Sequence, residues 1–172
     1  MKILLKKITV LLLFSSFFAT AQSITVSTID EYNSAIKKVS TGGTIILKNG
    51  EWKDVTLNAF GNGTKQNPII VKAETPGKVL ITGDSSLSIY GTYVIVSGLW
   101  FKDGMTTKKH VVQFRRNSKI FAYNCRFTNS TISYFDTAED ISNHWVDLYG
   151  KNTLVTNLCK QTLVKTKRIY WI

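Results

Sequence analysis

Short apolar runs separated by polar, glycine-containing turns recur along most of the chain. Five apolar pairs begin about every 25 residues, and the stretches between them contain no helical pattern. These pairs are Ile45-Ile46, Ile69-Ile70, Val94-Ile95, Ile120-Phe121 and Trp145-Val146. A strand-rich period of this size is typical of a solenoid, in which stacking buries apolar side chains that one coil cannot bury alone. The pattern therefore predicts an all-β fold, a right-handed parallel β-helix.

The segment TGGTIILKNGEW (41–52) is the first predicted rung, and Asn49-Gly50 turns the chain toward the next strand. The alternative is a β-sandwich, because short strands separated by turns also suggest two facing sheets. The even spacing of the apolar runs favours the coil.

One amphipathic helix is predicted before the first rung. Thr28 and Glu31 have the spacing of a capping box. Four apolar residues then fall on one face at helical spacing: Ile29, Tyr32, Ile36 and Val39. Because a solenoid exposes the core of its first coil, we expect this helix to cover that end.

Residues 1–21 have the features of an export signal. A start containing three lysines precedes an apolar stretch, and Ala19-Thr20-Ala21 fits a cleavage site. The mature chain would begin near Gln22 and be secreted or periplasmic. The apolar stretch is short for a membrane span, which needs about 20 residues, and no later segment is long enough.

The formal net charge of +11 is unevenly distributed. The signal and residues 151–172 hold much of the excess, and the last 22 residues contain no acidic residue. The body of the chain lacks the basic stripe expected of a nucleic-acid-binding protein. Two cysteines, Cys125 and Cys159, do not make a disulfide framework, and Cys125 is predicted to be a buried thiol.

Two later segments, FAYNCRFTNS (121–130) and HWVDLYG (144–150), resemble polysaccharide lyase family six. That family contains alginate lyases and chondroitinase B. Earlier segments resemble it too, so the similarity covers about residues 24–150: GGTIILKNGEW (42–52), NPIIVKAETPGKV (67–79) and YVIVSGLWF (93–101). The resemblance implies an exported lyase that cleaves acidic polysaccharide by β-elimination. Alginate is the first expected substrate, and chondroitin or dermatan sulfate the alternative.

The resemblance also implies a chemistry. A cation, usually Ca²⁺ held by acidic and amide side chains, neutralises the uronate carboxylate, while a lysine acts as base beside an arginine. In the family these residues lie on coils further along than the strand resembling 144–150. No catalytic residue and no metal ligand is therefore assigned in this chain.

The domain prediction has three parts: a signal at 1–21, the first coils of a lyase β-helix at 22–150, and an aberrant basic tail at 151–172. The tail departs from the family pattern, which favours a shifted reading frame or an incomplete gene over a short homologue. We expect the chain alone to be inactive. A non-catalytic carbohydrate-binding or structural β-helix is the alternative.

Three arginines are the candidate substrate-binding residues: Arg115, Arg116 and Arg126. The guanidinium group matches two carboxylate oxygens, although a solvated turn explains the Arg115–Arg116 pair as well.

Other polar clusters carry weaker hypotheses. The first is a predicted loop around Gly104, with cations that could touch a polyanion: Lys102, Lys108, Lys109 and His110. His110 has no catalytic partner visible in sequence. The second is an acidic group predicted to be an exposed loop: Asp136, Glu139 and Asp140. Trp145 or Tyr149 could stack on a sugar or pack under a loop.

Overall fold

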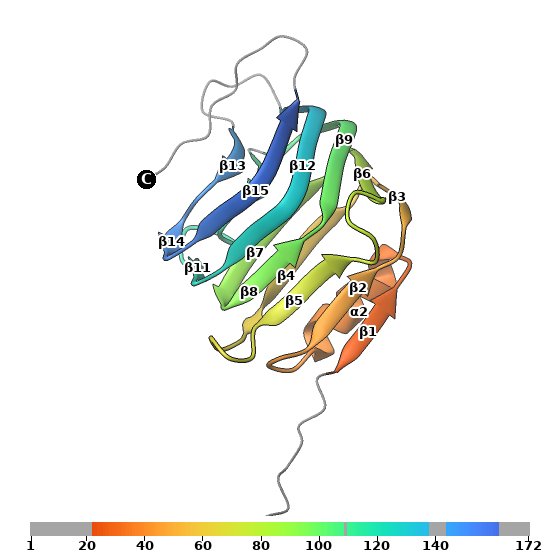
Figure 1. Cartoon of the computed structure of the whole chain (residues 1–172). Coiled ribbons are helices and arrows are strands. Elements are labelled where there is room, and N and C mark those ends of the chain that lie inside the picture. The colour runs from red at the N-terminus through yellow and green to blue at the C-terminus, as the bar shows by residue number, and fades with distance from the viewer. Residues whose placement is uncertain (1–21, 109, 138–143, 162–172) are drawn as a thin grey trace, which may run out of the picture.

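The protein folds as a coil of stacked parallel strands, as Figure 1 shows. The structure, a computed structural model, describes residues 22–108, 110–137 and 144–161. Coils follow one another from β1 to β15, and every pairing between named strands in the described residues is parallel. The predicted parallel β-helix is confirmed. The predicted signal at 1–21 lies outside the described residues.

The coil has three faces, each a ladder of strands from successive coils. The first face holds β1 (Ser23–Val26), β2 (Thr44–Leu47), β5 (Ile69–Ala73), β8 (Val94–Ser97), the start of β12 (Arg126–Thr137) and β15 (Leu154–Gln161). The second holds β3 (Gly50–Lys53), β6 (Val79–Gly83), β9 (Leu99–Thr106) and the rest of β12. The third holds β4 (Thr56–Asn62), β7 (Ser86–Thr92), β10 (His110–Gln113), β11 (Ala122–Tyr123), β13 (His144–Asp147) and β14 (Gly150–Lys151).

The first and second faces join through a bend in β12. Residues 126–128 pair with β8, and residues 131–137 pair with β9. At the bend Asn129 takes a left-handed φ of 48°, and Asn157 takes 50° at the same place in β15. Asparagine tolerates this conformation better than most residues. Because Nδ2 of Asn157 donates to Oδ1 of Asn129 at 2.9 Å, the two corners are also linked directly.

The core is built of side chains stacked in register. On the first face, Val71 pairs with Ile45 on one side and Val96 on the other, and Val96 pairs with Phe127. All four are buried. Across the interior, Phe101 meets Phe127 and Phe135 edge-on, with ring centroids 6.4 and 5.6 Å apart. Each coil therefore depends on its neighbours for its buried surface.

The helix α2 (Ile29–Lys38) covers the first coil, as predicted. Its buried residues are Tyr32, Ala35 and Ile36, and the hydroxyl of Tyr32 donates to the carbonyl of Asn58 in β4. Thr28 is the N-cap and accepts from the N–H of Glu31. The Glu31 carboxylate accepts from the N–H of Ser27 at 2.7 Å, one residue before the position a capping box would use.

The repeat is less even than the sequence suggests. The apolar runs at 45, 69 and 94 lie in β2, β5 and β8, as predicted. The prediction that the runs at 120 and 145 are equivalent to the earlier three is wrong. On the first face Val96 pairs with Phe127, and Phe127 pairs with Val155. Ile120 is exposed and Trp145 lies in β13 of the third face. The run at 120 lies in the segment inserted after β10, and the run at 145 lies in β13. Both fall at the earlier spacing by coincidence.

The predicted loop around Gly104 is wrong. Gly104 lies within β9 and pairs with Gly83 in β6, where the register shifts. A Cβ on Gly104 would approach the Phe135 ring to 2.5 Å and the Gly83 carbonyl to 2.7 Å. Glycine at this position therefore allows two coils to pack closely instead of making a turn.

The stack continues past the predicted boundary at residue 150. Strand β14 pairs with β11, and β15 pairs with β12 from Leu154 to Gln161. The segment NTLVTN (152–157) places asparagines in the same register as NCRFTN (124–129). The remaining tail, 162–172, lies outside the described residues.

Candidate functional site

A short hairpin interrupts the third face between β10 and β11. Arg115 forms an antiparallel bridge with Phe121, and the N–H of Arg116 donates to the carbonyl of Ile120 at 2.9 Å. The side chain of Asn117 accepts from the N–H groups of Lys119 and Ile120 at 2.9 and 3.0 Å, which fixes the tip. We call residues 115–121 the cationic hairpin.

The cationic hairpin presents three positive side chains: Arg115, Arg116 and Lys119. Arg116 and Lys119 are exposed, and Cζ of Arg115 lies 3.7 Å from the ring centroid of Tyr149. None of the three forms an ion pair within the part of the chain that the structure describes. Unpaired guanidinium groups beside an aromatic ring suit an anionic sugar, because the fork binds a carboxylate and the ring packs on a pyranose.

A buried polar network lies beside the hairpin. Nε2 of His110 is 2.7 Å from Oδ2 of Asp147, and both residues are buried. The backbone N–H of His144 donates to Nδ1 of His110 at 3.2 Å, and the two imidazole rings stack with centroids 5.3 Å apart. Since Nδ1 of His110 accepts, its Nε2 carries the proton that faces Asp147.

This network holds Asp147 ionised. Burial alone would raise the pKa of the Asp147 carboxyl, but the hydrogen bond from His110 and nearby positive charge, including Arg115, lower it below its ordinary value. Both ring nitrogens of His110 contact protein groups, so the ring orients Asp147 and lacks a free nitrogen to act as a base. No pattern in the sequence indicates this contact, because residues 110 and 147 meet only when coils stack.

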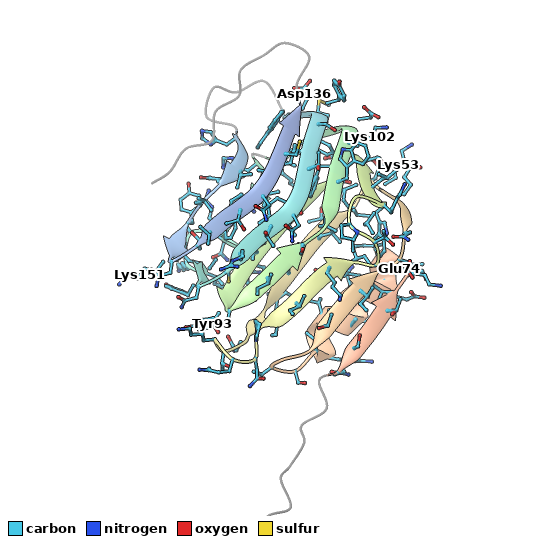
Figure 2. The ribbon with its side chains drawn as sticks, in the orientation of Figure 1. Lys53, Glu74, Tyr93, Lys102, Asp136 and Lys151 are labelled. Atoms are coloured by element: carbon cyan, nitrogen blue, oxygen red, sulfur yellow. The ribbon has the colours of Figure 1, made fainter. Side chains whose placement is uncertain are left out.

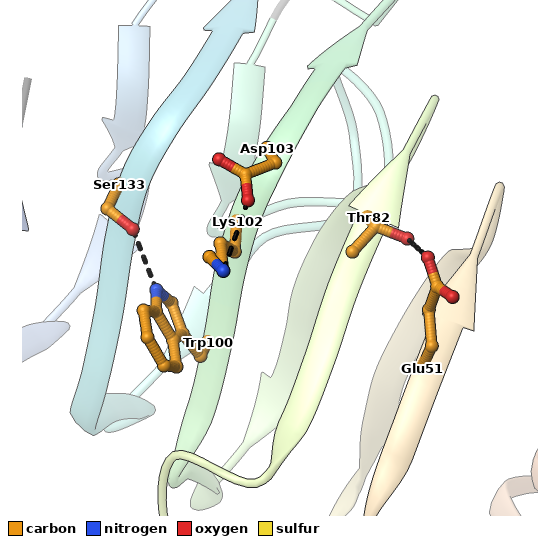
Figure 3. Close-up of polar contacts among 6 residues, drawn as sticks. All are labelled: Glu51, Thr82, Trp100, Lys102, Asp103 and Ser133. Carbon is orange, nitrogen blue, oxygen red and sulfur yellow. Dashed lines mark hydrogen bonds and ion pairs between the residues drawn. The ribbon is translucent and has the colours of Figure 1, made fainter. Parts of the chain in front are cut away.

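On the outer surface of the second face, polar side chains contact one another, as Figure 3 shows. Nζ of Lys102 lies 3.2 Å from the Asp103 carboxylate and 5.3 Å from the Trp100 ring centroid. The indole N–H of Trp100 donates to Ser133 at 2.7 Å. Lys102 thus has a carboxylate neighbour and is a weaker candidate for polyanion binding. Lys108 is exposed, and Lys109 lies outside the described residues.

The structure brings together two of the three predicted arginines. Arg115 and Arg116 share the cationic hairpin before β11. Arg126 lies after β11 at the start of β12, is exposed, and lines a separate groove with Lys65 and Tyr93. Sequence adjacency predicted the pair but could not separate Arg126 from it.

The remaining candidate residues differ in burial. Trp145 is buried and its indole N–H donates to the Phe135 carbonyl at 2.8 Å, so it packs inside the coil. Tyr149 remains partly exposed beside Arg115. Asp136 is exposed at the end of β12, but Glu139 and Asp140 lie outside the described residues, and the acidic loop stays a prediction. Cys125 is a buried free thiol, as predicted, and Cys159 is exposed.

Two cations were missed by the sequence interpretation. Lys119 follows the Asn117-Ser118 turn, which marks a hairpin tip, and Lys65 follows Gly63 in the loop before β5. Only the turn signals could have pointed to them, since a single lysine in a loop is usually a solvated charge.

Comparisons with known proteins agree with this architecture. The fold is that of a parallel β-helix, and residues 26–167 match the family described as Chondroitinase B. The chain belongs to this family, within polysaccharide lyase family six. No curated protein sequence matches the chain.

Three solved structures place the chain among these lyases. The PL6 family alginate lyase AlyGC is 39% identical with a TM-score of 0.74, over 77% of this chain and 18% of that one. A PL6 family polysaccharide lyase from Pseudopedobacter saltans is 32% identical with a TM-score of 0.68, over 84% of this chain and 35% of that one. A mannuronic acid specific family 6 lyase from human gut microbiota is 25% identical with a TM-score of 0.68, over 78% and 32%.

The chain therefore spans 18–35% of the length of these three solved lyases. Within the residues that the structure describes, no helix has both the length and the apolar character needed to cross a membrane.

Proposed function

We propose that this chain supplies the N-terminal coils of an exported polysaccharide lyase that cleaves uronic-acid polysaccharide by β-elimination, with alginate as its substrate. The family match over residues 26–167 carries the proposal. The unpaired charges of the cationic hairpin support a polyanionic substrate. Chondroitin or dermatan sulfate is the alternative substrate.

The hairpin suits one requirement of this chemistry. The C5 proton of a uronate becomes acidic enough to remove only when the neighbouring carboxylate is neutralised, and fixed positive charge can do this. Arg116 and Lys119 point their charges to solvent, and Arg115 is held over Tyr149. In the proposal these three cations bind and orient substrate carboxylates along the coil.

The Ca²⁺ expected for the family does not fit the residues described here. Their one group with three potential metal-binding side chains is His110, His144 and Asp147. Calcium takes about six to eight oxygen ligands, whereas this group offers two imidazoles and a carboxylate already engaged by His110. We therefore assign no step to calcium in these coils.

The chain alone would bind acidic polysaccharide without cleaving it. This follows from the proposal that the base and the cation site belong to coils which the solved relatives carry beyond the matched part. The small share of AlyGC that the chain covers, 18%, favours this view. A non-catalytic carbohydrate-binding or structural β-helix remnant is the competing candidate.

The test measures binding and cleavage together. The purified 172-residue chain would be incubated with alginate, polymannuronate, chondroitin and dermatan sulfate while the ultraviolet absorbance of unsaturated uronate is followed. Affinity electrophoresis in gels containing each polymer would measure binding. We expect retardation by alginate and no absorbance change.

Charge-matched variants make the test specific. Arg115→Gln with Arg116→Gln should weaken alginate binding by about tenfold, since two charged contacts are lost. Lys53→Gln with Lys72→Gln removes the same charge at exposed positions on β3 and β5 and should change binding little. Cleavage by the wild-type chain, or equal binding by both variants, would contradict the proposal.

Export is a separate part of the proposal. If residues 1–21 are a signal, expression with a functional secretion pathway should yield a chain that begins at Gln22. Intact mass of the exported protein would measure this, and retention of the N-terminal methionine in a cytoplasmic fraction would contradict it.

A further inference from the structure

A second cationic site lies at the corner where the third face turns into the first. A groove of about 380 Å³ opens there, within the size range of small-ligand sites. Five polar or aromatic side chains define what we call the corner groove: Lys65, Tyr93, Asn124, Arg126 and Asn152. Figure 2 shows Tyr93 at this edge of the molecule, with Lys151 further up the stack, away from Lys53 and Lys102.

The floor of the groove is a ladder of equivalent corner residues. The N–H of Tyr93 donates to the Tyr123 carbonyl, and the N–H of Asn124 donates to the Lys151 carbonyl, so Tyr93, Asn124 and Asn152 stack in successive coils. All three have left-handed φ angles, of 48°, 54° and 54°. Coils repeat at about 4.8 Å, so the groove runs along the stack.

The side chains of this ladder change in type from one coil to the next. Nδ2 of Asn152 donates to Oδ1 of Asn124 at 3.1 Å, which makes an amide rung. In the coil before Asn124 the equivalent residue is Tyr93, so an aromatic side chain takes the place of another asparagine. The groove therefore offers a ring at one end and amide groups at the other.

The charges in the corner groove are unbalanced. Lys65 and Arg126 are both exposed, and no carboxylate belongs to the groove lining. Neither forms an ion pair among the described residues. Two cations sharing one groove repel each other, so an anion bound between them gains favourable interactions with both.

We propose that the corner groove binds a short anionic segment of an acidic polysaccharide, as a second contact separate from the cationic hairpin. Lys65 and Arg126 would bind the acidic group, Tyr93 would pack against a pyranose ring, and Asn124 would hydrogen-bond hydroxyl groups. The ligand class rests on the proposed function, whereas the site itself rests on the groove and its unpaired cations.

The experiment compares three variants that each remove two positive charges. Lys65→Gln with Arg126→Gln alters the corner groove, Arg115→Gln with Arg116→Gln alters the hairpin, and Lys53→Gln with Lys72→Gln is the control. Calorimetry would measure binding of a borohydride-reduced mannuronate tetramer to each full-length variant. The thermal midpoint of each variant would show that the fold is retained.

The groove variant should bind the tetramer about tenfold more weakly than the control, and the hairpin variant should keep a binding step that the groove variant lacks. A dermatan sulfate tetramer would distinguish sulfate from carboxylate as the preferred group. A neutral mannose tetramer should bind to neither site.

Binding by the groove variant equal to the control would overturn the groove proposal, whatever the hairpin variant does. If only the hairpin variant lost binding, the groove would be refuted while the proposed function stood. If the groove bound the neutral tetramer as tightly as the mannuronate tetramer, the assignment of an anionic ligand would be wrong even though the site existed. If no variant and no wild-type chain bound an acidic oligosaccharide, both proposals would fail.

Discussion

Two coils of the stack differ in the number of residues that separate equivalent positions on the first face. Asn49 and Thr75, which bond across neighbouring coils, are 26 residues apart, whereas Val94 and Cys125 are 31 apart. The longer coil contains the cationic hairpin. Each strand of a regular coil must present apolar side chains to the interior, whereas residues inserted outside the stack are free of that requirement.

This comparison separates residues that hold the fold from residues that are free to bind. Phe101 in β9 is fully buried and touches Phe127 and Phe135 across the interior. Arg116 in the hairpin is exposed and forms its hydrogen bond through the backbone. Substitutions at the two places should therefore act on different properties.

The largest expected effect is in the core. Phe101→Ala should lower the free energy of unfolding by about 3–5 kcal/mol, because it removes a ring from a packed stack. Urea denaturation followed by circular dichroism would measure this. Trp100→Ala, at the next residue but on the half-exposed outer surface, is the matched control and should cost clearly less. Equal losses would mean that the interior is not packed as described.

An intermediate effect is expected at the network beside the hairpin. Asp147→Asn should lower the free energy of unfolding at neutral pH by about 1 kcal/mol, because a hydrogen bond to a charged group becomes a neutral one. The pKa of Asp147 is lowered in the folded protein, so its contribution is present above the unfolded value of about 3.9. It is lost as the pH falls through the folded pKa.

Urea midpoints of the wild type and of Asp147→Asn, measured from neutral pH downward, test this sign. The difference between them should be constant above the ordinary aspartate range and shrink in acid. A difference that grows in acid would show that Asp147 is not held ionised.

The smallest effect on stability is expected in the hairpin. Arg116→Gln with Lys119→Gln should change the free energy of unfolding by less than about 0.5 kcal/mol, as is usual for exposed side chains. The same variant should bind alginate more weakly, and its binding should depend less on salt concentration. The control is Lys37→Gln with Lys38→Gln, which removes the same charge in the last turn of α2, far from the hairpin in the sequence. Loss of stability in the hairpin variant alone would mean that its charges hold the fold.

The early part of the stack was predictable because its signals are local. The capped helix, the Asn49-Gly50 turn and the apolar runs at 45, 69 and 94 each reflect a few neighbouring residues. The later coils were not, since Phe127 and Val155 could be recognised as partners of Val96 only through strand register. An insertion of a few residues shifts the spacing without changing the composition.

The sequence by itself determined that the chain coils, because apolar strands at a regular period can be buried only by stacking. It also determined that arginines follow an apolar strand. Only the tertiary structure decided which charges share a site, since it separates Arg126 from Arg115 and joins Arg126 to Lys65. It also joined His110 to Asp147. These contacts join residues on different coils, and their positions depend on loop lengths that no local pattern records.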